Sequence, residues 1–112
     1  MSEEINIPYI HWGDYKSKDS HNPDILEIEV TTLEQFESEL STNIQCRQKI
    51  HDTWEDRILP LKSHESNNSS LLKTWNELVQ RKRIIVGSKI IIHTYLGISK
   101  NGRVIRKFQV EV

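Results

Sequence analysis

Acidic residues are absent from a long part of this chain, since no Asp or Glu occurs from Leu78 through Val110. The first 39 residues have the opposite bias, with ten acids against only Lys16 and Lys18. The formal net charge of −1 therefore hides an acidic beginning and a basic end. Such asymmetry points to a polyanionic partner, although the two ends can instead neutralise each other in the fold. The acid-free stretch carries the cations Arg81, Lys82, Arg83, Lys89, Lys100, Arg103, Arg106 and Lys107.

Several other features are scarce. Cys46 is the one cysteine, so an internal disulfide is impossible. No segment approaches the roughly 18 apolar residues of a membrane span. The first residues, MSEEINIPY, lack the basic and apolar regions of a signal peptide. A chain of 112 residues fits one domain, and we expect it to be cytoplasmic with no membrane partner.

Motifs that would assign a reaction are also missing. The chain has no Gly-rich phosphate loop and no dinucleotide fingerprint. Its five histidines occur singly and without metal-ligand spacing. Cys46 falls on the apolar face of an expected strand, where a cysteine is usually a small core residue. We therefore expect no enzymatic activity, no cofactor and no metal.

Period-two and helical patterns divide the chain. Residues 1–24 read as an irregular N-terminal arm whose aromatics, Tyr9, Trp12 and Tyr15, either pin it to the domain or await a ligand. The domain itself spans residues 25–112. Residues 25–30 alternate as a half-buried strand. Residues 31–39 are ambiguous, because Thr31 and Glu34 resemble a helix capping box while a long, bent strand also fits.

The remaining elements follow in order. The patterns predict strands at 40–50 and 57–62, a helix from Leu71 through Arg83, and strands at 89–96 and 104–112. Trp54 lies near the tip of the first hairpin, and Pro60 indicates that the second of its strands ends or runs along an edge. The Asn101-Gly102 pair predicts a tight turn in the last hairpin.

This order, three strands, a helix and two strands, resembles the oligonucleotide/oligosaccharide-binding (OB) fold, an all-β, five-stranded, partly open barrel. The segment VGSKIIIHTYLGISKNGRVIRKFQVEV is also similar to the closing hairpin of small single-stranded-DNA-binding proteins of that fold. The alternative is an α+β ferredoxin-like sandwich, which requires residues 31–39 to be a helix.

In an OB-like barrel, the second and third strands and the loops beside them hold the ligand. The outward set on the second strand is Asn43, Gln45, Arg47 and Lys49, while Trp54 and Tyr95 are the flat side chains on which bases can stack. The expected nucleic-acid-binding residues are therefore Arg47, Lys49, Trp54, Arg57, Tyr95, Lys100 and Arg103.

We expect non-catalytic binding of single-stranded DNA or RNA through this basic, aromatic-bearing face. The alternative is a protein-interaction subunit of a DNA replication or repair assembly, with protein partners or self-association. This alternative is supported by the near-zero net charge and the acidic first third, which are unusual for a protein that covers nucleic acid on its own.

Overall fold

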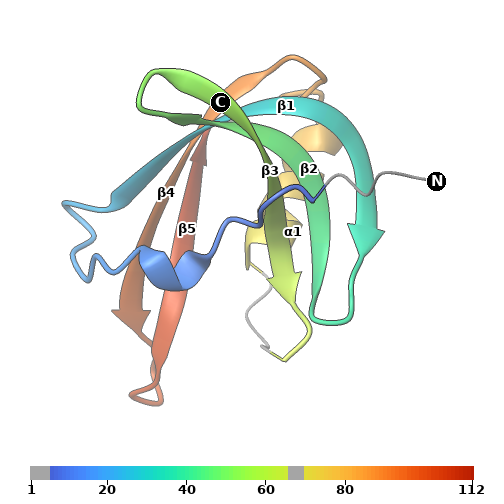
Figure 1. Ribbon diagram of the computed structural model, residues 1–112. Helices are drawn as coiled ribbons and strands as arrows, with labels where there is room; N and C mark the ends of the chain where they lie inside the picture. Colours follow the sequence, from blue (N-terminus) through green and yellow to red (C-terminus); the bar gives the residue numbers. More distant parts are fainter. Residues whose placement is uncertain (1–5, 66–69) are drawn as a thin grey trace.

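The computed structural model describes residues 6–65 and 70–112. Within these ranges the chain is mostly strand, and the expected order of elements is confirmed. The elements are the 3₁₀ turn η1 (Trp12–Asp14), β1 (Asp24–Glu37), β2 (Ser41–Ile50), β3 (Thr53–Ser63), α1 (Ser70–Gln80), β4 (Lys89–Ile98) and β5 (Val104–Glu111). Figure 1 shows their arrangement. No described helix is long and apolar enough to cross a membrane.

The five strands form one antiparallel sheet in the order β3-β2-β1-β4-β5. The β2–β3 hairpin turns at His51 and Asp52, both with positive φ, as a two-residue type I′ turn requires. Gly102 supplies the positive φ of the β4–β5 turn. In the described ranges β3 and β5 are the two edges of the sheet and no ladder joins them, so the sheet is not closed.

The ambiguous segment after Val30 is a strand. β1 continues to Glu37, which pairs with Thr42 of β2, and the register shifts between Val30 and Gln35. This irregularity lets one long strand bend, and it breaks the alternation that marks a strand in the sequence. The capping-box interpretation is wrong, and so is the ferredoxin-like alternative that depended on it.

Two predicted boundaries also need correction. β3 is longer than the predicted 57–62, although Pro60 does lie on an edge strand as predicted. The helix ends at Gln80, so the cations that follow lie beyond its last turn. It stops there because Lys82 adopts φ +59° and the Arg83 N–H bonds back to the Leu78 carbonyl at 2.8 Å.

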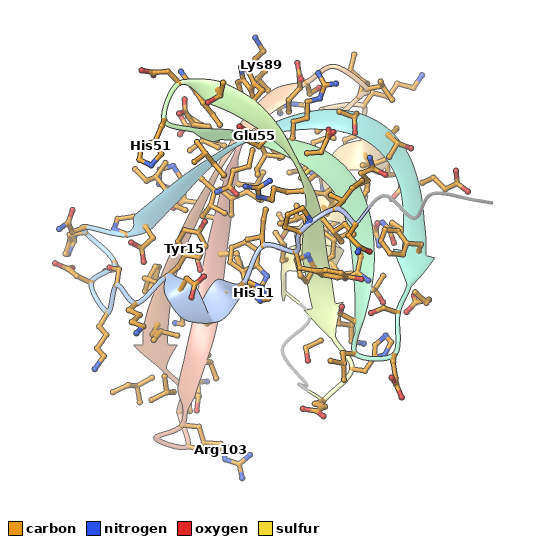
Figure 2. All side chains as sticks on the ribbon, in the orientation of Figure 1. His11, Tyr15, His51, Glu55, Lys89 and Arg103 are labelled. Carbon is orange, nitrogen blue, oxygen red and sulfur yellow. The ribbon has the colours of Figure 1, made fainter. Side chains whose placement is uncertain are left out.

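The N-terminal arm is pinned along the free edge of β3. The Ile10 N–H donates to the Ile58 carbonyl at 2.8 Å, and the Ile58 N–H donates to the Pro8 carbonyl at 2.9 Å. Further on, the Trp12 Nε1–H donates to the Pro60 carbonyl at 3.0 Å. The arm therefore runs beside β3, in front of the gap between the two edge strands (Figure 2).

The same arm reaches β5 on the other side of the gap. The Trp12 ring meets Phe108 edge-on, with centroids 4.9 Å apart. Arg106 donates to the Tyr15 carbonyl at 2.7 Å, and its partial burial lowers the pKa of its guanidinium. Gln48 donates to the Tyr15 hydroxyl at 2.9 Å. Because α1 also lies against β3 and β5, the arm and the helix together bridge the two edges.

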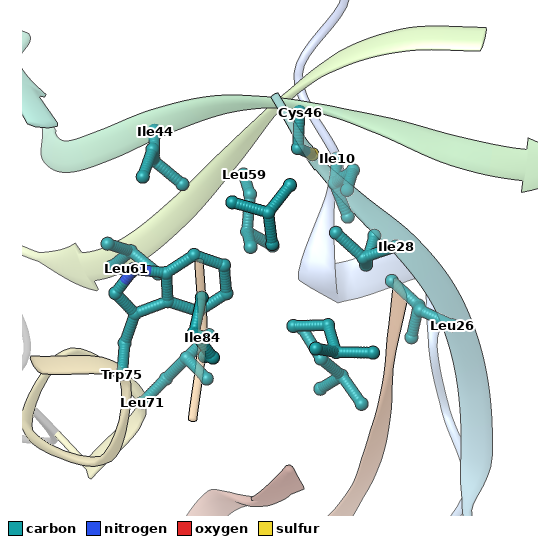
Figure 3. Close-up of a cluster of buried hydrophobic side chains, with 13 residues drawn as sticks. Ile10, Leu26, Ile28, Ile44, Cys46, Leu59, Leu61, Leu71, Trp75 and Ile84 are labelled. Atoms are coloured by element: carbon teal, nitrogen blue, oxygen red, sulfur yellow. The ribbon is translucent and has the colours of Figure 1, made fainter. Parts of the chain in front are cut away.

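The core lies between the curved sheet, α1 and the arm (Figure 3). Trp75 and Cys46 are both buried there, Cys46 as predicted, and burial raises the pKa of the Cys46 thiol to about 12. On β4 the inward residues are Ile90 and Ile92, so Tyr95 faces the other way. The core residues are Ile10, Leu26, Ile28, Val30, Ile44, Cys46, Leu59, Leu61, Leu71, Trp75, Ile84, Ile90 and Ile92.

Candidate nucleic-acid interface

The outer face of β2 and β3 differs in part from the predicted one. Gln45 and Arg47 are exposed, but Asn43 is fully buried. The Asn43 amide nitrogen donates to the Ser41 carbonyl, and its amide oxygen accepts from the Ser41 hydroxyl. Arg57 pairs in register with Cys46, which places it on the core side of the sheet. Its Nη1 donates to the Asp56 carbonyl at 2.7 Å. Arg57 and Asn43 therefore add little to an outward ligand face.

Arg47 is flanked by acids that the sequence order does not reveal. It pairs in register with Asp56 on β3 and with Glu29 on β1, and Glu29 in turn pairs with Lys89 on β4. The Arg47 guanidinium lies 3.3 Å from the Asp56 carboxylate and 3.8 Å from that of Glu29. Exposed pairs of this kind contribute about 0–1 kcal/mol to stability. They nevertheless offset the Arg47 charge that a phosphate would otherwise meet.

Two lysines lie beside Trp54. Trp54 lies opposite Lys49 in the β2–β3 register, and the Lys89 Nζ lies 5.6 Å from its ring centroid. The indole is half-buried, and neither lysine forms an ion pair with any residue in the described ranges. We call Lys49, Trp54 and Lys89 the Trp54 platform. Lys89 was not predicted, because only the β1–β4 pairing brings it here.

The other predicted residues lie on the β4–β5 hairpin. Tyr95 pairs with Lys107 on the outer face. Gly97 leaves room for the Lys107 chain, since a Cβ there would meet its Cε at 3.0 Å. Lys100 and Arg103 are exposed at the turn. In Figure 2, Arg103 lies at the opposite end of the molecule from Lys89, so the predicted site falls into two separate groups.

A pocket of about 530 Å³ opens between the arm, the β1–β2 loop and the end of β3. Its walls are mainly apolar and include Leu40, which was predicted to lie in the strand but stands 64% exposed before it. None of the pocket residues was among the expected binding residues. Tyr9 and Trp12 were predicted either to pin the arm or to await a ligand, but no local pattern shows that the arm docks on β3. The lining residues are Tyr9, Ile10, His11, Trp12, Ser38, Glu39, Leu40, Ser41, Pro60 and Ser63.

Among the described residues, no three His, Cys, Asp or Glu side chains gather as they would to hold a metal ion. Comparisons with protein-family models, with curated proteins and with solved structures find no match. Function is therefore inferred from the residues and their geometry alone.

Proposed function

We propose that this protein binds single-stranded DNA or RNA without acting on it chemically. The observation that carries the proposal is the Trp54 platform, a half-buried indole beside two lysines that form no ion pair within the described ranges. A sequence-tolerant single-strand binder needs flat side chains on which bases stack and cations that follow the phosphates. The platform supplies both within one patch of the outer face.

The strand order and the position of the helix support an OB-like, partly open barrel as the scaffold. In this proposal the arm and α1 take the place of direct pairing between β3 and β5. The Trp12 contacts with Pro60 and Phe108 favour that role, because they span the gap between the edges. A ligand then lies across the outer face of β2 and β3.

Fluorescence anisotropy with labelled oligo-dT and a matched duplex tests the proposal. We expect the single strand to bind and the duplex to bind weakly. Trp54→Ala should weaken single-strand binding about 5- to 150-fold, since one stacked base is worth about 1–3 kcal/mol. Lys49→Glu with Lys89→Glu should weaken it further. Lys73→Glu, an exposed charge reversal on α1, is the matched control and should leave affinity close to wild type.

Absence of binding at both about 50 and about 200 mM salt would refute the proposal. The alternative function, a protein-interaction subunit, is then the better supported hypothesis. A specific observation favours it, because Ile98 and Val104 pair across the β4–β5 hairpin and are 72% and 68% exposed. Apolar side chains in such a place suit a protein partner more than a phosphate backbone.

A further inference from the structure

Two aromatic side chains of the arm share the outer face with Trp54. Ile10 is 4% exposed and belongs to the core, so its neighbours Tyr9 and His11 point the other way. Tyr9 also bridges in parallel to Ile58, whose partner on β2 is the exposed Gln45. Tyr9 is half-buried and His11 is exposed, as expected for outward positions.

These side chains line up along β3. Trp54 and Ile58 are four residues apart on the strand, a distance of about 13 Å at the usual rise. Because the arm runs parallel to β3, Tyr9 lies beside Ile58 and His11 follows toward Pro60. The outer face along β3 therefore carries Trp54 at one end and the rings of Tyr9 and His11 at the other, where the pocket opens.

We infer that the Tyr9–His11 pocket is a second base subsite, which accepts one unstacked base of a strand that also stacks on Trp54. The inference rests on the proposed function. The pocket volume of about 530 Å³ falls within the usual ligand range of about 300–1,000 Å³. The bound strand then runs along the edge of β3 rather than across the whole sheet.

The chemistry of the walls favours a neutral ring over a phosphate. Leu40, Trp12 and Pro60 are apolar surfaces, and the charged group among the lining residues is the Glu39 carboxylate, which repels anions. Hydrogen bonds at Ile58 and Pro60 hold the arm, so this wall exists before a ligand arrives. A preformed wall spares the ligand the cost of ordering the arm.

Matched variants at Tyr9 test the inference with oligo-dT of about 2 and about 12 nucleotides. The longer one lies within the site size of one such fold, whereas the shorter one has a single internucleotide step and cannot span the roughly 13 Å from Trp54 to Ile58. Tyr9→Phe keeps a flat ring, whereas Tyr9→Leu keeps an apolar side chain without one. We expect Tyr9→Phe to bind both oligonucleotides as the wild type does. Tyr9→Leu should lose about 5- to 150-fold in affinity for the longer oligonucleotide and little for the shorter one, which reaches Trp54 alone.

His11→Ala provides a second measurement that leaves the fold untouched, because His11 is exposed and outside the core. It should also weaken the longer oligonucleotide selectively. If Tyr9→Leu and His11→Ala bind it as tightly as Tyr9→Phe while Trp54→Ala loses affinity, the second subsite is overturned and the proposed function stands. If the wild type binds neither oligonucleotide, both fall.

Discussion

Removal of the Trp12 side chain should destabilise the fold, because this residue joins two strands that do not pair. Its indole N–H donates to the Pro60 carbonyl of β3 at 3.0 Å, and its ring meets Phe108 of β5 with centroids 4.9 Å apart. Trp12→Ala removes both contacts at once. The two edges of the sheet then keep only α1 and the rest of the arm as a bridge.

The size of the effect follows from the burial of the indole. Truncation of a fully buried tryptophan costs about 3–5 kcal/mol, and Trp12 is half-buried. We therefore expect Trp12→Ala to lower the free energy of unfolding by about 2–3 kcal/mol. Trp12→Phe retains an aromatic edge for Phe108 but loses the hydrogen bond, which is worth about 0.5–1.5 kcal/mol. A domain of this kind has about 5–15 kcal/mol in total, so both variants should remain folded.

Urea unfolding followed by circular dichroism measures these differences. Trp54→Ala is the matched control, since Trp54 is also half-buried on β3 but loses only its contact with Lys89 and some apolar area. We expect a loss of about 1 kcal/mol for that control, near the value of one exposed cation–π contact. If Trp12→Ala unfolds within about 0.5 kcal/mol of the wild type, the arm does not bridge the edges as the contacts indicate.

Two further predictions concern single titratable groups. Burial raises the pKa of Cys46 to about 12, so iodoacetamide should label it only as fast as the protein unfolds, and labelling at the rate of a free thiol in native buffer would contradict its core position. The Thr42 hydroxyl and then His64 lower the pKa of Glu37, so its contribution to stability is present above the ordinary pKa of a glutamate and disappears as the pH falls through the lowered pKa. The stability difference between the wild type and Glu37→Gln should vanish there in urea titrations, and a constant difference would argue against these contacts.

Much of the fold could be predicted, because alternation and turn chemistry act locally. The helical stripe containing Trp75 and the turn at Gly102 follow directly from residue spacing. The segment after Val30 could not be assigned, because the irregularity in β1 removes the alternation that would have marked it as a strand. A capping pattern at Thr31 then fitted the same residues equally well.

The candidate site was harder to predict than the fold, because its surroundings depend on pairing between distant strands. Arg47 is a cation on an outward face in the sequence, but the β1 and β3 neighbours bring Glu29 and Asp56 to it. At Trp54 strand pairing adds a cation instead, because pairing of β1 with β4 brings Lys89 to the ring. No local pattern in the sequence predicts the acids beside Arg47 or the lysine beside Trp54.

In the proposed function, the Trp54 platform holds a single strand through its two lysines. The most direct test is the slope of log affinity against log salt concentration for oligo-dT, measured for the wild type, Lys49→Gln and Lys89→Gln, with Lys73→Gln as the control. Each platform variant should reduce the magnitude of the slope by about 0.7, the value for one phosphate contact on a single strand. Slopes that match the control and the wild type would show that these lysines meet no phosphate, and the platform would not be the binding site.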